Sequence, residues 1–221
     1  MKSTVINFAI SSNVDFYKKT IPVIVPSLLR QGYKPENIWV FIGDENKNFG
    51  RVNHIRACVY NVPIRAFEFT AAIGIMDYFP DPDRYWFLMH DTCVAGPNFR
   101  ASLESKIKQD EVTALNSDGL NNMGLCCTSY LLSHKSKLES YRGYSGDTLL
   151  ELKRKTIGEE GWLFRGSPSN LCTRHRMELD VPTFEIYGTE NRKLEYWEEI
   201  DLYKYKSNYV TLEDGNYNLQ L

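Results

Sequence analysis

The sequence lacks the features of a membrane or secreted protein. No uninterrupted apolar run is long enough to span a bilayer, and the best candidate is broken by Pro22 and Pro26. The N-terminal stretch MKSTVINFAISS has no long apolar segment of the kind that signal peptides carry. No Asn-X-Ser/Thr acceptor site for glycosylation occurs. These absences predict a cytoplasmic protein without an integral membrane segment.

Cysteine and net charge are also scarce. The five cysteines are an odd number, and none has the spacing of a paired metal knuckle. They are expected to be buried free thiols in a reducing compartment. A formal charge of -2 gives no general attraction for nucleic acid or for an anionic membrane. The basic cluster at residues 153–155 is typical of a solvated helix face.

Several catalytic fingerprints are missing. There is no Gly-X-Ser-X-Gly elbow, no Walker-type phosphate loop and no dinucleotide-binding fingerprint. The first apolar run ends in Ser11-Ser12-Asn13, which is not the Gly-rich phosphate loop that a nucleotidyltransferase normally has. A Ser-His-Asp hydrolase and a nucleotidyltransferase are therefore disfavoured.

The pattern of elements predicts one α/β domain. Apolar runs at residues 4–10, 38–42, 56–62 and 85–89 read as strands, and residues 15–29 and 67–78 as helices, the first capped by Asp15 and ending near Gly32. This order favours a mainly parallel central sheet flanked by helices, with Ser11, Ser12, Asp44 and Asp91 along one edge. We expect a single domain over residues 1–221, with a Rossmann-like, nucleotide-binding half at 1–100 and a more variable half at 101–221.

The second half is less regular. Strands are predicted at residues 112–116, 125–132, 181–186 and 203–210, and helices at 135–141 and at 147–155, where Asp147 is the expected cap. Residues 158–168 are rich in turn formers, and such loops often carry function.

The most informative stretch is RYWFLMHDTCVAGPNF, residues 84–99. An apolar strand ends abruptly at His90, Asp91 and Thr92. Ligands of open α/β sheets bind at the carboxyl ends of such strands, so Asp91 is well placed to meet a metal or a phosphate. The alternatives are that Asp91 is a turn or cap residue before Gly96-Pro97 and that His90 is simply hydrogen-bonded.

The first half resembles the GT-A glycosyltransferases. In that family a helix ending in an SLL-x-Q-G-Y type sequence leads into a strand that ends in an acid, and residues 21–46, IPVIVPSLLRQGYKPENIWVFIGDEN, are similar, with Asp44 as the acid. The strand YWFLMHDT stands where the family carries its Asp-X-Asp motif. The likeness covers roughly the first half. In overall size the chain is also similar to transferase domains of large DNA viruses and phages.

The resemblance implies transfer of a hexosyl or deoxyhexosyl group from a nucleotide sugar, first of all a UDP sugar, to a glycan or glycoprotein. It implies that Asp44 meets the uracil or ribose and that Ser11 and Ser12 line the base pocket. Thr70 and Gly74 are candidates on the helix beside that pocket. Ordinary turn roles for Asp44, Ser11 and Ser12 remain open. So does a packing role in the helix for Gly74. The stereochemistry, inverting or retaining, is also open.

The resemblance further implies a divalent metal, Mn²⁺ or Mg²⁺, that neutralises the diphosphate leaving group as a Lewis acid. Asp91 would hold it, with His90 as a second ligand that suits Mn²⁺ better than Mg²⁺. This sequence offers one carboxylate here instead of two. Lysine or arginine could neutralise the phosphates instead. The basic residues near the C-terminal end that could do so are Arg192, Lys193, Lys204 and Lys206, and nothing in the sequence singles one out.

A Gly-Glu-Asp type turn often supplies the general base in this family, and residues 157–162, Ile-Gly-Glu-Glu-Gly-Trp, resemble it. Glu159 and Glu160 are thus the candidate bases that deprotonate the acceptor hydroxyl. Trp162 could stack on a sugar face. Plain surface roles for the acids, and a core role for Trp162, are the alternatives. The missing second Asp leaves a further possibility, a non-catalytic module on the same fold that binds a glycan or a partner protein.

Overall fold

The computed structural model describes most of the first half and separate segments of the second. The described residues are 5–14, 17–44, 56–108, 111–116, 122–142, 149–174, 176–180 and 193–205. The expected caps Asp15 and Asp147, the expected strand at 181–186 and residues 206–210 lie outside them.

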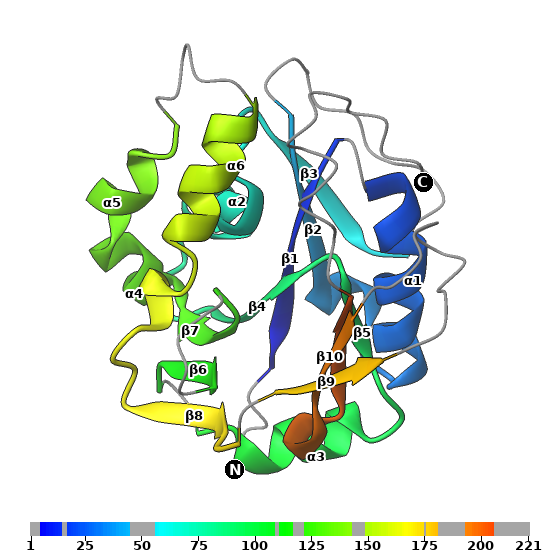
Figure 1. The fold of residues 1–221 in the computed structure, drawn as a ribbon. Coiled ribbons are helices and arrows are strands. Elements are labelled where there is room, and N and C mark those ends of the chain that lie inside the picture. The colour runs from blue at the N-terminus through cyan, green and yellow to red at the C-terminus, as the bar shows by residue number, and fades with distance from the viewer. Residues whose placement is uncertain are drawn as a thin grey trace.

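A seven-stranded sheet forms the centre of the molecule, in the order β3-β2-β1-β4-β7-β6-β8 (Figure 1). Its strands are β1 (Asn7–Asn13), β2 (Ile38–Gly43), β3 (Cys58–Val62), β4 (Tyr85–His90), β6 (Thr113–Asn116), β7 (Gly124–Cys127) and β8 (Ser169–Cys172). Only β7 runs antiparallel to its neighbours β4 and β6. The other pairings are parallel, which confirms the prediction of a mainly parallel sheet.

Helices cover both faces of this sheet (Figure 1). The α-helices are α1 (Tyr17–Arg30), α2 (Thr70–Tyr78), α3 (Phe99–Lys106), α4 (Thr128–Ser133), α5 (Lys135–Glu139) and α6 (Leu149–Gly158). Short 3-10 turns are η1 (Pro35–Asn37), η2 (Phe67–Phe69), η3 (Trp162–Phe164) and η4 (Glu198–Ile200). No helix among the described segments combines the length and the apolar character that crossing a membrane requires.

Two hydrophobic cores lie on the two faces. Phe8 and Ile10 of β1 pack into a core with α1, whereas Ala9 between them packs into the core under α2. Successive side chains of a strand point to opposite faces, so a strand covered on both sides reads as a continuous apolar run. This is why the strands of the first half are visible in the sequence.

Two local expectations are corrected. Ser11, Ser12 and Asn13 are not a loop but the end of β1, because they stay in register with β2 up to the pair Asn13↔Gly43. The strand expected at 125–132 ends at Cys127, where α4 begins. For Gly74, the structure supports the packing alternative, since a Cβ there would lie 2.3 Å from the Phe41 ring.

A second, antiparallel sheet lies beside the end of β4 and has the order β5-β11-β10-β9. Its strands are β5 (Cys93–Ala95), β9 (Met177–Asp180), β10 (Lys193–Trp197) and β11 (Leu202–Tyr205). After β4, the chain turns at Asp91 and Thr92 and continues as β5. Because β11 pairs with β5, it lies beside this end of β4.

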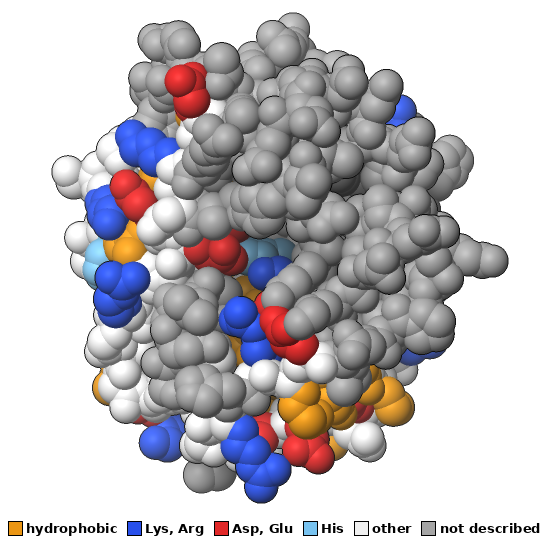
Figure 2. All heavy atoms as spheres, in the orientation of Figure 1, with side chains coloured by type: hydrophobic (Ala, Val, Ile, Leu, Met, Phe, Trp, Pro, Cys, Tyr) orange, Lys and Arg blue, Asp and Glu red, His pale blue; other side chains and the backbone are white. Residues whose placement is uncertain are grey.

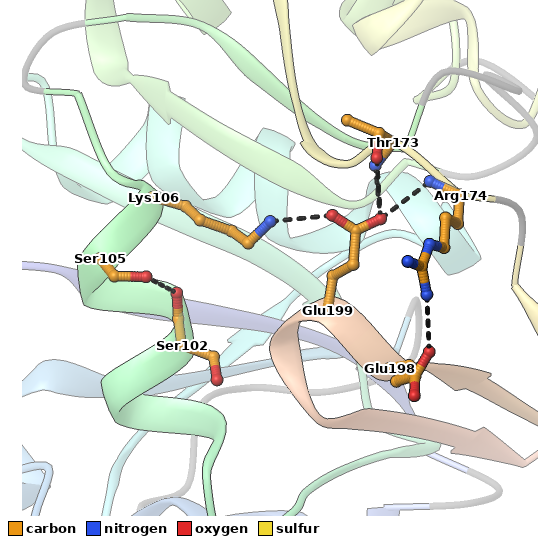
Figure 3. A network of polar contacts seen from close by, with 7 residues as sticks. All are labelled: Ser102, Ser105, Lys106, Thr173, Arg174, Glu198 and Glu199. Atoms are coloured by element: carbon orange, nitrogen blue, oxygen red, sulfur yellow. Dashed lines mark hydrogen bonds and ion pairs between the residues drawn. The ribbon is translucent and has the colours of Figure 1, made fainter.

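Glu199 fastens the β10–β11 hairpin to the rest of the molecule (Figure 3). Its carboxylate accepts hydrogen bonds from Lys106 Nζ on α3 at 2.9 Å and from the backbone N–H groups of Thr173 and Arg174, each at 2.8 Å. Burial alone would raise the pKa of Glu199, but these hydrogen bonds outweigh it and lower the pKa from 4.5 to about 2. The ionised carboxylate is therefore part of the folded structure.

This depressed pKa predicts a pH-dependent contribution to stability. The folded pKa lies below the unfolded value, so the contribution is fully present above about pH 4.5 and is lost as the pH falls toward 2. We expect Glu199→Gln to lower the free energy of unfolding at pH 7 by about 2 kcal/mol. The difference from the wild type should shrink on acidification. Urea unfolding at several pH values measures it.

The neighbouring Glu198 provides the control. It pairs with Arg174 at 3.2 Å, and its side chain is 58% exposed. Exposed pairs contribute little, so Glu198→Gln should change stability by less than about 0.5 kcal/mol. An equal effect of the two substitutions at every pH would contradict the role assigned to Glu199.

Candidate site at the strand ends

The candidate site lies where the strand order of the main sheet changes direction. From β1 the chain moves outward to β2 and β3 on one side, and β4 pairs with β1 on the other. In open α/β sheets, ligands bind outside the carboxyl ends of the strands at such a switch point. The carboxyl ends here are Ser11–Asn13 on β1 and His90 on β4.

Asp91 holds this edge together. Its Oδ2 accepts a hydrogen bond from Ser12 Oγ at 2.5 Å and another from Thr20 Oγ1 of α1 at 2.7 Å. Its backbone N–H donates to the carbonyl of Ser11 at 3.1 Å. The residue is only 8% exposed. Asp91 thus joins β1, β4 and α1, and one of its carboxylate oxygens already accepts hydrogen bonds from two hydroxyl groups.

Ser11 links the same edge to the start of α2. Its hydroxyl donates to the carbonyl of Glu68 at 3.1 Å and accepts the N–H of Ala71 at 3.0 Å. Next to Ala71, the buried Thr70 hydroxyl has no hydrogen-bond partner among the described residues. Buried hydroxyls are normally satisfied, so this one is notable.

Asp44 directly follows β2 and is buried. Its backbone N–H donates to Val62 O of β3 at 3.0 Å. The structure therefore places Asp44 at the same edge of the sheet as Ser11, Ser12 and Asp91, as the strand pattern predicts. What Asp44 binds stays a prediction.

The adjacent acids Glu159 and Glu160 point to different surroundings. Glu159 accepts a hydrogen bond from Tyr141 Oη and lies 3.9 Å from Lys137 Nζ, on the α5 side. Glu160 instead places Oε1 at 3.8 Å from Nε2 of His90. Of the two predicted bases, the structure brings only Glu160 to the carboxyl end of β4.

The turn that carries Glu160 is shaped by its neighbours. Gly161 has a φ of +92°, a left-handed conformation that glycine adopts without strain. Its N–H donates to Oδ1 of the buried Asn122 at 3.0 Å. Trp162 begins η3 and packs near Phe69, with Lys137 Nζ 4.3 Å from its ring centroid. Trp162 therefore lies on the α5 side with Glu159.

Lys204 completes the group around Glu160. This residue of β11 places Nζ at 3.7 Å from Oε1 of Glu160, the same oxygen that faces His90. Figure 2 shows acidic, basic and histidine side chains meeting near the centre of one face. The sequence pointed to Lys204 only as one of several basic residues, because its partner Glu160 is distant along the chain.

The described residues fit a resident divalent metal poorly. No three of their His, Cys, Asp or Glu side chains form a group that could hold an ion. Oδ2 of Asp91 accepts hydrogen bonds from two hydroxyl groups, and Glu160, which lies beside His90, faces the ammonium group of Lys204. The metal ligands Asp91 and His90 therefore remain predictions.

Comparison with known proteins adds little. No protein-family model matches the sequence, and no curated protein matches it. Among solved structures, the chain is similar to the apo-form glycosyltransferase GlyE of Streptococcus pneumoniae TIGR4, with a TM-score of 0.36 and 11% identity. The match covers 70% of this chain and 44% of that one. A likeness this low carries no argument about function.

The contacts of Asp91 predict energetic coupling to α1. Thr20→Val removes one of the two hydroxyl groups that donate to Oδ2 and should lower the free energy of unfolding by about 1–2 kcal/mol. In a double-mutant cycle with Asp91→Asn, the two changes should couple by about 1 kcal/mol. Urea unfolding of the single and double variants measures the coupling.

Thr128→Val is the matched control for this cycle. Thr128 is also buried, but its hydroxyl accepts a hydrogen bond from Trp86 Nε1 instead. Its effect should add to that of Asp91→Asn. Additivity of Thr20→Val with Asp91→Asn would mean that the bond between Thr20 and Asp91 contributes nothing.

Proposed function

We propose that this protein is a glycosyltransferase that moves a sugar from a nucleotide donor, first of all a UDP sugar, to a hydroxyl group of a glycan or glycoprotein. The observation that carries the proposal is the meeting of Glu160, His90 and Lys204 at the carboxyl end of β4. An acid and a cation at a topological switch point suit a reaction in which a proton is removed and an anion departs.

In this proposal the nucleoside lies along the ends of β1 and β2. Asp44 would accept hydrogen bonds from the ribose or uracil, and Ser11 and Ser12 would line the base pocket. Thr70 supports this placement, because its buried hydroxyl at the start of α2 has no partner among the described residues. The diphosphate would then extend toward His90 and Asp91.

Glu160 is the proposed general base. The acceptor oxygen forms a bond to the anomeric carbon while the bond from that carbon to the phosphate oxygen breaks, and the nucleoside diphosphate leaves with the electron pair. Glu160 takes the proton of the acceptor hydroxyl. Direct displacement of this kind inverts the anomeric centre. Glu159 is not assigned this role, because it bonds to Tyr141 and faces Lys137.

The predicted Mn²⁺ or Mg²⁺ at Asp91 and His90 stands beside this proposal as a separate hypothesis. A hard divalent cation can bind through a single carboxylate together with substrate phosphates. Because the described donor set fits a resident ion poorly, no step above passes through a metal. Donor binding measured with Mn²⁺ and with EDTA tests that hypothesis.

The second candidate is a non-catalytic module that binds a glycan or a partner protein. The observation in its favour is that Asp91 and Glu160 both contact side chains of the protein itself. It predicts binding without donor hydrolysis, and no loss of function when both glutamates become glutamine.

The matched pair Glu160→Gln and Glu159→Gln tests the proposed base. Removing a general base typically slows the reaction 100-fold or more, so Glu160→Gln should lower kcat by about 100-fold. Glu159→Gln should change it by less than about twofold. The assay is release of nucleoside diphosphate from a panel of nucleotide sugars, with glycan acceptors present. Unchanged turnover in Glu160→Gln would eliminate it as the base.

A binding screen tests the function itself. Thermal shift with the same nucleotide sugars, with and without Mn²⁺, should show a stabilising donor. Failure of every nucleotide sugar to bind the wild-type protein would rule out glycosyl transfer by this chain.

A further inference from the structure

Lys204 occupies an unusual place for a lysine. Its side chain is 16% exposed, on a strand that pairs with both β5 and β10. The strand register sets it beside Cys93 on β5 and Glu195 on β10. Lysine is rarely buried unless it is paired, because removing an ammonium group from water is costly.

The charges around Lys204 keep it protonated. Burial alone would lower the pKa of its ammonium group, but the carboxylates of Glu160, Glu195 and Glu68 contribute to raising the pKa above its usual value. The cation is therefore permanent at neutral pH. The fold holds a fixed positive charge next to the end of β4.

Pairing within its own hairpin does not explain why a lysine stands at position 204. Its cross-strand neighbour Glu195 has a closer cationic partner, Arg176, with Nε at 2.8 Å from the carboxylate. Lys204 instead faces Glu160, which does not belong to the hairpin. The separation of 3.7 Å is longer than a hydrogen bond, so this contact is a loose ion pair that an incoming anion can replace.

We propose that Lys204 is the cation that receives the donor's diphosphate and stabilises it as it leaves, with Glu160 as its counter-ion in the ligand-free protein. This inference rests on the proposed glycosyl transfer. The fixed ammonium group supplies the charge that a divalent metal would otherwise bring. It also links the two halves of the site, since β11 lies near the end of the described chain.

An order of binding follows from this ion pair. The diphosphate replaces Glu160 as the partner of Lys204, and the acceptor hydroxyl then meets a Glu160 carboxylate that no longer pairs with this lysine. The donor therefore binds before the acceptor. Glu160 therefore separates from Lys204 only when a leaving group is in place.

Binding of UDP and of uridine distinguishes a contact to the diphosphate from a contact to the nucleoside. Both probes are titrated by calorimetry in EDTA against the wild type, Lys204→Met and Lys204→Arg. A charge-assisted contact of the usual strength predicts that Lys204→Met weakens UDP binding about 10–100-fold and leaves uridine binding unchanged. Lys204→Arg should recover much of the loss.

Lys137→Met is the matched control. Lys137 pairs with Glu159 at 3.9 Å, as Lys204 pairs with Glu160, but on the α5 side. It should leave the binding of both probes unchanged within about twofold, the scale expected of an exposed ion pair. Equal losses in the two methionine variants would show a general charge effect and overturn the assignment.

A second variant keeps the test decisive if Lys204→Met does not fold. Glu160→Gln removes the competing counter-ion, so it should tighten UDP binding about threefold or more, as expected when an exchangeable ion pair is removed. Weaker UDP binding by Glu160→Gln would overturn the inference.

The remaining outcomes separate this inference from the function on which it rests. Loss of wild-type UDP binding in EDTA with recovery in Mn²⁺ would assign the charge to a metal and refute the role of Lys204, while glycosyl transfer stands. Equal UDP affinity of the wild type and Lys204→Met would refute that role alone. Failure of the wild type to bind either probe under any of these conditions would contradict both.

Discussion

The carboxylate of Asp91 is the contact on which the arrangement of this edge depends. Ser12 on β1 and Thr20 on α1 both donate to the same oxygen, directly after β4 ends. A carboxylate that accepts two hydroxyl hydrogen bonds in a buried setting constrains all three elements, because losing either leaves a buried polar group unsatisfied. His90 directly precedes Asp91, and β5 begins shortly after it. The contacts of Asp91 therefore fix the backbone position from which the His90 side chain and β5 extend.

The second sheet brings chemistry from the far end of the described chain to the same place. Pairing with β5 orients β11, and Glu199 within η4 and Asp201 directly after it hold the hairpin in place by hydrogen bonds. Asp201 has a φ of +52° and accepts the N–H of Asn98 at 2.7 Å. The position of Lys204 is thereby determined by backbone pairing and polar contacts, and the two halves of the chain contribute to one candidate site.

Much of the fold follows from short-range patterns, whereas the site does not. Apolar runs predict the buried strands because both faces of the sheet are covered, but Ser11–Asn13 continue β1 as polar residues, which pattern alone assigns to a loop. The approach of Asp44 and Asp91 to one edge follows from parallel strands. The separation of Glu159 from Glu160 and the approach of Lys204 do not, since they depend on how a turn and a late hairpin meet β4.

A crystal structure of the protein with UDP and Mn²⁺ tests the central claim most directly, that the strand ends of β1, β2 and β4 form a nucleotide-sugar site completed by Lys204. The account predicts the nucleoside beside Ser11 and Asp44, and a diphosphate oxygen about 3 Å from Nζ of Lys204, in place of Glu160. UDP bound elsewhere would contradict it. A diphosphate held by a metal at Asp91, with Lys204 still facing Glu160, would contradict the role of Lys204.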